Sequence, residues 1–188
     1  MKILAIADRP PREKINKILE KNNDISLICT LGDLDYLSLI ELAEIHRIPK
    51  IGVYGNHDSG TYFEKLGIIN LHLKTWEFGG YIFGGFQGSV RYKENPYAIM
   101  YTQEEAFELL KRFPYVDVMI AHCPPYGIND EPDNLAYQGF KALRHYLEKR
   151  RPRYFLHGHT YPGKKELITE YCDTKIIYVY SDKIIEIN

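Results

Sequence analysis

Residues 49–58, PKIGVYGNHD, decide the fold, because they join a short apolar strand to a polar loop at Gly55-Asn56. Two earlier stretches have the same form: KILAIAD (2–8) and DISLICTLGD (24–33) are apolar runs that end in an acid. Apolar residues at helical spacing predict helices between them, over residues 11–22 and 36–47. Strands that alternate with helices indicate an α/β sheet that is parallel in its first half.

The second half of the chain contains more strand-like segments, with glycine punctuation and two helical patterns. Strands are expected within 71–78, 81–88, 115–125 and 153–160, helices over 103–113 and 138–151, and a terminal hairpin that turns at Ser181-Asp182. Several of these strands are too amphipathic for a fully covered parallel sheet. We therefore predict an α/β fold in one domain, 1–188, with two packed mixed β-sheets (a β-sandwich) flanked by helices.

Composition restricts the classes of protein to which the chain can belong. The net charge of −1 provides no global attraction to nucleic acid or to anionic lipid, and no apolar run approaches the roughly 20 residues of a membrane span. The first residues lack a secretory signal pattern. The cysteines are odd in number and widely spaced, which argues against a disulfide framework. We expect a cytoplasmic protein without nucleic-acid or membrane partners.

Polar side chains follow five of the predicted strands. They are Asp8, Asp33, Asn56, His122 and His159. Ligands of α/β sheets bind at the carboxyl ends of the strands, where these side chains fall. Carboxylates, an amide oxygen and imidazoles form a mixed oxygen and nitrogen site that suits Mn, Fe, Ni or Zn. A pair of such ions would neutralise a phosphoester and generate a hydroxide at neutral pH, so the sequence predicts a divalent-metal site for phosphoester hydrolysis.

The motifs GD, GNHD, a single histidine after a strand, and GH occur in this order, and together they resemble the calcineurin-like metallophosphoesterase family. The resemblance spans nearly the whole chain and implies a helix-flanked β-sandwich with a dinuclear centre. It implies that Asp33 bridges the ions, that Asn56, His122 and His159 complete one site, and that Asp8 binds the other ion. From the residues alone, Asp8 could instead cap the following helix.

The resemblance also implies the catalytic residues. His57 resembles the phosphate-facing histidine that assists the leaving group while a metal-bound hydroxide attacks, and Asp58 is expected to hold its ring. Arg91 follows a glycine-rich segment, and residues 84–105 resemble a less studied branch of the family. Arg91 is expected to reach a phosphate oxygen, with an ordinary surface arginine as the alternative.

The sequence departs from the family pattern at two positions. Pro10 stands where the first motif, DxH, has its histidine, and Tyr161 stands at the second histidine of GHxH. Both losses affect the ion on the Asp8 side, so we expect one tight ion and a second, weaker one. His157 lies two residues before His159 and is expected to support the ligands from behind or to replace one of them.

Two classes of function follow from these motifs. The first is an enzyme that hydrolyses a small phosphomonoester or phosphodiester. The alternative is a catalytically weak or inactive binding scaffold on the same fold, and the intact GNHD motif favours the enzyme. A nuclease is disfavoured because no basic stripe accompanies the motifs. The sequence leaves homodimer formation open.

Overall fold

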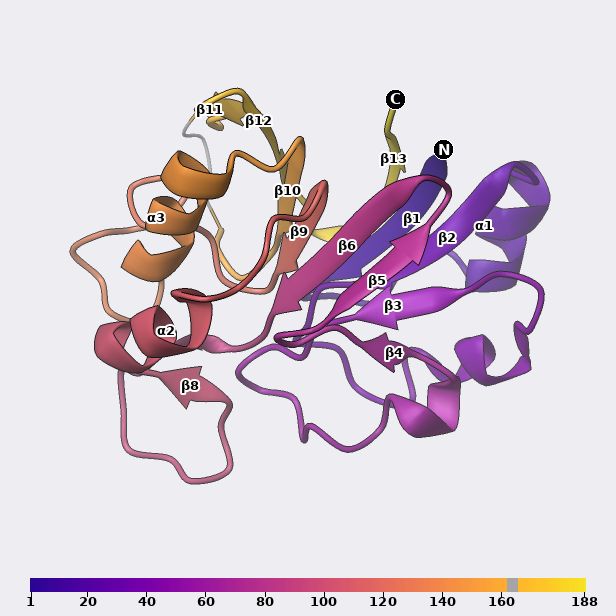
Figure 1. The fold of residues 1–188 in the computed structure, drawn as a ribbon. Helices are drawn as coiled ribbons and strands as arrows, with labels where there is room; N and C mark the ends of the chain where they lie inside the picture. The colour runs from indigo at the N-terminus through magenta and orange to yellow at the C-terminus, as the bar shows by residue number, and fades with distance from the viewer. Residues whose placement is uncertain (162–165) are drawn as a thin grey trace.

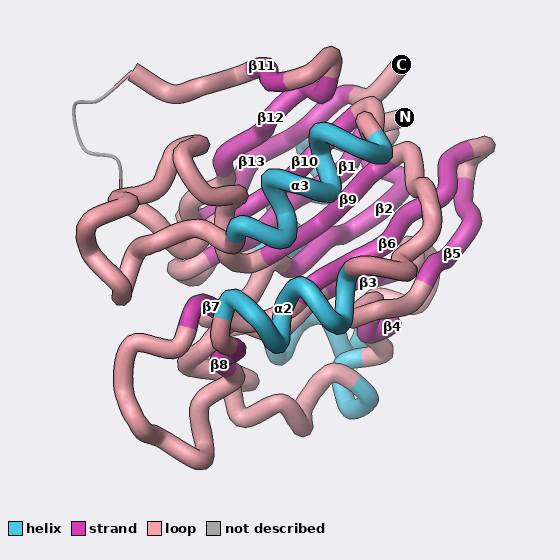
Figure 2. Tube along the Cα trace, turned by 60° about the vertical axis from the view of Figure 1, so that its left-hand side comes forward, coloured by secondary structure: helices cyan, strands magenta, loops and turns pink. Residues whose placement is uncertain are grey.

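The computed structural model describes residues 1–161 and 166–188, and in it two sheets lie face to face with helices on their outer faces (Figures 1 and 2). The first sheet has the order β13-β1-β2-β3-β4. Its parallel strands are β1 (Lys2–Ala7), β2 (Ile25–Thr30), β3 (Lys50–Gly52) and β4 (Ile69–Asn70). The last strand, β13 (Ser181–Glu186), pairs with β1 in the antiparallel direction.

The second sheet has the order β11-β12-β10-β9-β6-β5, and its centre is also parallel. The parallel strands are β6 (Tyr81–Phe86), β9 (Val118–Ala121), β10 (Tyr154–His157) and β12 (Thr174–Tyr178). The antiparallel edges are β5 (Thr75–Phe78) and β11 (Glu170–Tyr171). A short parallel pair, β7 (Ser89–Val90) and β8 (Met100–Tyr101), lies apart from both. The predicted fold class of two packed mixed sheets is confirmed.

Alternation along the strands divides the core into three layers. In β1, Ile3, Ala5 and Ala7 face the second sheet, whereas Leu4 and Ile6 face the helical layer outside the first sheet. All five are fully buried, because this strand is covered on both faces. A third apolar layer lies between the second sheet and its two helices.

Within the described part of the chain, three α-helices cover the sheets. Helix α1 (Ile15–Lys21) lies on the first sheet, and α2 (Gln103–Leu110) and α3 (Lys141–Arg150) lie on the second, where Figure 2 shows them in cyan. Helix α2 starts at a capping box, in which Thr102 and Glu105 each accept a hydrogen bond from the other's backbone N–H. Short 3₁₀ helices are η1 (Ile40–Glu44) and η2 (Glu64–Leu66).

The helix expected over residues 36–47 is wrong, since only the 3₁₀ helix η1 forms there. Leu37, one of the apolar residues in this segment, is 75% exposed. The Asp35 carboxylate accepts a hydrogen bond from Ser38 N, and the Ser38 hydroxyl donates to the Asp35 carbonyl. These side-chain bonds compete with helical ones and hold the chain in a turn.

The predicted terminal hairpin is also wrong. Strand β12 belongs to the second sheet and β13 to the first, so the chain crosses between sheets at Val179-Tyr180. Val179 N donates to the His157 carbonyl in one sheet. Ser181 then takes a positive φ of 60°, and its hydroxyl donates to the Pro10 carbonyl beside the other sheet. Apolar alternation fitted both strands and did not reveal which sheet each one joins.

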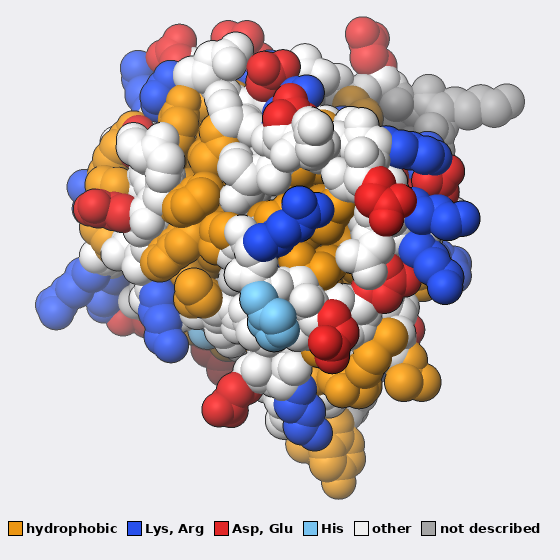
Figure 3. Space-filling model, turned by 90° about the vertical axis from the view of Figure 1, so that its right-hand side faces the viewer, with side chains coloured by type: hydrophobic (Ala, Val, Ile, Leu, Met, Phe, Trp, Pro, Cys, Tyr) orange, Lys and Arg blue, Asp and Glu red, His pale blue; other side chains and the backbone are white. Residues whose placement is uncertain are grey.

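The surface shows no concentration of one charge on the face drawn in Figure 3. Basic and acidic side chains are interspersed there around hydrophobic groups. Within residues 1–161 and 166–188, no helix has the length and apolar character required to cross a bilayer.

Candidate metal centre

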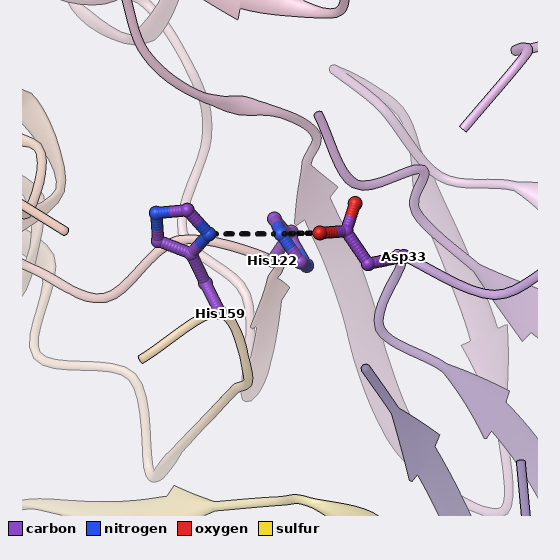
Figure 4. Close-up of side chains that lie close together, drawn as sticks. All are labelled: Asp33, His122 and His159. Atoms are coloured by element: carbon purple, nitrogen blue, oxygen red, sulfur yellow. Dashed lines mark hydrogen bonds and ion pairs between the residues drawn. The ribbon is translucent and has the colours of Figure 1, made fainter. Parts of the chain in front are cut away.

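The loops after β2, β3, β9 and β10 bring four side chains to one end of the sandwich. Ligand-type atoms of Asp33, His122 and His159 all lie within 4.8 Å of one another (Figure 4). Asn56 joins them, since its Oδ1 lies 3.1 Å from His122 Nε2. The parallel strands of both sheets end here, so the structure brings together the four residues that the sequence assigned to one metal.

His122 is the centre of this group, and a backbone contact fixes its tautomer. Its Nδ1 lies 2.8 Å from the Leu31 carbonyl, which only accepts, so Nδ1 carries the hydrogen. The opposite nitrogen, Nε2, lies 3.1 Å from His159 Nδ1 and 3.4 Å from Asp33 Oδ2. A carbonyl behind a histidine ring is typical of metal-ligating histidines, because it aims the other nitrogen at the ion.

The chemistry of these atoms fits a divalent cation. In the neutral ring, the His122 Nε2 lone pair faces the oxygens of Asn56 and Asp33, which also carry lone pairs and no hydrogen. Lone pairs that converge in a buried site repel one another unless a cation lies between them. Without an ion, a proton compensates in part. Burial opposes charge on His122, but the two carboxylates Asp33 and Asp8 and the hydrogen bond to the Leu31 carbonyl together raise the His122 pKa to about 9.

Burial and charge also shift the pKa values of the two residues beside His122. For Asp33, burial favours the neutral form, yet the charges and hydrogen bonds of His122 and His57 together outweigh burial and hold the carboxyl pKa well below its usual range. Burial lowers the pKa of His159 to about 3, so its ring is neutral and keeps a lone pair at neutral pH. An ionised carboxylate beside a neutral imidazole is the state that binds metal.

Asp8 lies next to this group but has a backbone partner. Both of its carboxylate oxygens lie 3.0 Å from His159 N, and burial raises its pKa to about 6. A Cβ on Gly158 would stand 2.5 Å from Asp8 Oδ2, so only glycine permits this approach. Helix α1 begins at Ile15, with Lys14 at its cap, so Asp8 is not the cap of that helix. The ligand role of Asp8 remains a prediction.

The structure assigns Asp58 a different task from the one expected. Its carboxylate was predicted to hold the ring of His57, but both of its oxygens already accept two hydrogen bonds each. The four donors are Asp33 N, Leu34 N, Gly55 N and the Tyr62 hydroxyl. Asp58 therefore fastens the GD loop to the GNHD loop. The contact of Tyr62 with Asp58 was not predicted, because the only sign of it in the sequence is that Tyr62 lies four residues after Asp58.

His57 is held by its backbone and exposes its ring. Its backbone N–H donates to Asp33 Oδ1 at 2.8 Å, so the main chain of His57 is fixed to a candidate metal ligand. The ring lies in an open cleft of about 600 Å³ that also contains Asp33. The role of His57 toward a bound substrate remains a prediction.

His157 and Arg91 lie outside the group of ligand atoms. His157 is fully buried, with Nδ1 3.1 Å from the Gly158 carbonyl and Nε2 3.2 Å from Asn129 Nδ2. Burial lowers its pKa to about 4. These contacts hold His157 against the GH loop, and its role toward a metal ligand remains a prediction. Arg91 instead pairs with Glu105 at 2.9 Å and lines a different hollow from His57, so the structure offers no support for phosphate binding by Arg91.

Comparison with known proteins shows the family to which the chain belongs. A model of the calcineurin-like phosphoesterase family matches residues 1–163. The chain belongs to this family. A comparison with curated protein sequences found no match. Among solved structures, one chain with 15% identity aligns over 94% of this chain and 89% of its own length, with a TM-score of 0.65. The protein TT1561 of Thermus thermophilus aligns over 96% and 89%, with 17% identity and a TM-score of 0.59. At these identities the structural likeness concerns the fold alone, which agrees with the sandwich described above.

Proposed function

We propose that this phosphoesterase-family chain is an active hydrolase that cleaves a small phosphomonoester or phosphodiester with the help of divalent ions. The observation that carries the proposal is the convergence of Asp33, Asn56 and His159 on Nε2 of His122. These residues would hold one ion. When bound, divalent ions supply charge neutralisation and a nucleophile at neutral pH.

Residues of the chain would deliver the proton to the leaving group and hold the two loops in position. Water provides the oxygen of the new P–O bond, the P–O bond to the alcohol breaks, and a proton must reach the leaving oxygen. His57 is the group placed to deliver that proton, since its ring is exposed in the cleft beside Asp33. Asp58 maintains this arrangement through its four hydrogen bonds to the two loops.

The test combines metal analysis with a substrate panel. Protein purified without added metal is analysed for bound ions and then assayed on phosphomonoesters and phosphodiesters with Mn, Fe, Ni or Zn. We expect hydrolysis that requires metal in the wild type and is lost in His122→Ala. Metal binding without hydrolysis of any substrate would overturn the proposal and would favour the binding scaffold.

A further inference from the structure

We propose that the cleft beside His57 binds the alcohol part of the substrate and that this alcohol is polyhydroxylated, so that the substrate is a sugar phosphate or polyol phosphate. The inference rests on the proposed function and adds a substrate class to it. It depends on which side chains line the cleft and on which of their polar atoms remain free.

The cleft has the position that a leaving-group site requires. Two loops form it, one after β2 and one after β3, and Asp33 and His57 belong to its wall. A phosphoryl group held at the centre beside Asp33 would place its leaving oxygen near His57, and the alcohol would extend into the cleft. Its volume of about 600 Å³ lies in the ordinary range for small-molecule sites.

The outer wall is rich in groups that bind hydroxyls. It contains Asp35, Ser59, Thr61 and Lys65, all exposed. Asp35 Oδ1 accepts from Ser38 N, and the carboxylate has further lone pairs. The Ser59 and Thr61 hydroxyls lie 3.1 Å apart, so one of them donates its hydrogen to the other. The hydrogen of the accepting hydroxyl remains available to a ligand. A carboxylate, two hydroxyls and an ammonium can accept from and donate to neighbouring sugar hydroxyls.

The remaining lining explains why other alcohols fit less well. Leu34 and Tyr62 lie beneath the surface at 2% and 6% exposure, so neither forms an open apolar wall for an aryl or lipid group. Tyr36 also lines the cleft, where it is half-buried against the helical layer. Asp35 and Lys65 carry opposite charges, so the outer wall has no excess positive charge for a second phosphate.

The test compares two substrates in matched variants of the metal-loaded protein. The ratio of kcat/KM for a hexose 6-phosphate to kcat/KM for phenyl phosphate is measured first in the wild type. It should fall roughly tenfold in Thr61→Val and in Lys65→Met, since one lost hydrogen bond to a ligand is worth about a factor of ten. Lys17→Met, an exposed lysine on α1 outside the cleft, is the control and should keep the wild-type ratio. An unchanged ratio in both cleft variants would overturn the inference while hydrolysis itself stands.

A binding measurement separates the inference from the proposed function. Calorimetry compares the methylene phosphonate analogue of the hexose 6-phosphate with phenylphosphonate, neither of which is hydrolysed. We expect the sugar phosphonate to bind at least about tenfold more tightly, and Lys65→Met to remove most of that preference. Equal affinity for the two phosphonates would refute the substrate class even if the enzyme is active. Preference for the sugar phosphonate without hydrolysis of any phosphoester would instead refute the proposed activity alone.

Discussion

The two sides of the centre differ in how their side chains are held. On one side, Asn56, His122 and His159 direct side-chain atoms at one point. On the other side, the Asp8 carboxylate is already hydrogen-bonded to the backbone. Both Asp8 oxygens lie 3.0 Å from His159 N, and the neighbouring family histidines are replaced by Pro10 and Tyr161. Tyr161 is 47% exposed and packs against Tyr180 with its ring edge-on. The difference teaches that the fold can preorganise one group of candidate ligands while a neighbouring carboxylate stays engaged with the backbone.

The largest effect should come from breaking the preorganised side. His122→Ala removes the central nitrogen, so the tight ion should be lost and hydrolysis should fall by about 10³-fold or more, because the ion supplies several kcal/mol. Metal content by mass spectrometry and turnover of one phosphoester measure the two outcomes. His145→Ala, outside the centre, is the control. A tight ion retained by the His122 variant would show that the convergence has been misinterpreted.

His57 separates chemistry from metal binding on the same side. His57→Ala should retain the ion and lower kcat by roughly 10²–10⁴-fold, the usual contribution of a positioned acid. Exposed His46 lies outside the cleft, so His46→Ala should match the wild type. Unchanged turnover in the His57 variant would remove this residue from the mechanism.

Unequal occupancy is the direct prediction for the two sides. Titration calorimetry should show one ion bound tightly and a second bound at least about tenfold more weakly, because oxygen ligands without imidazoles discriminate poorly among divalent ions. Activity should continue to rise after the first equivalent. Pro10→His should tighten the second site. Two ions of equal affinity in the wild type would contradict this difference between the sides.

The smallest effect concerns His72, a half-buried histidine outside the centre. Burial lowers the pKa of His72 to about 4, below its unfolded value near 6.5. The unfolded chain then binds more protons between these values, so stability is full above pH 6.5 and is lost as pH falls toward 4. From pH 7 to pH 5, wild type should lose about 1–2 kcal/mol more than His72→Gln by urea unfolding. Equal losses of stability in the two proteins would show that His72 does not contribute to the pH dependence of unfolding.

Much of the centre could be predicted from sequence, because its side chains follow apolar strands whose carboxyl ends meet. Asp33, Asn56, His122 and His159 were found in this way. The Leu31 carbonyl that orients His122 could not be found, since every residue has a carbonyl and only the fold selects one. Asp58 was assigned to the nearest histidine in the sequence, while its actual partners are mainly backbone N–H groups of two loops.

The fold shows the same division between local pattern and long-range pairing. Apolar periodicity located strands such as β9 and β10, but it did not distinguish a hairpin from a crossing at Val179-Tyr180. The helix expected over 36–47 failed because the turn bonds of Asp35 and Ser38 outweighed a helical apolar pattern. Periodicity records which face of a segment is buried, and the choice of neighbour depends on the whole molecule.

The crossing from β12 to β13 has a consequence for how the chain is made. Strand β1 is synthesised long before β13, yet Lys2 pairs with Glu186 and Ala7 pairs with Ser181. One edge of β1 therefore stays unpaired on the ribosome until the residues of β13 emerge, when the first sheet can close. Pairing at such sequence separation folds slowly, and an open strand edge meanwhile favours aggregation, so chaperone protection matters until β13 has paired with β1.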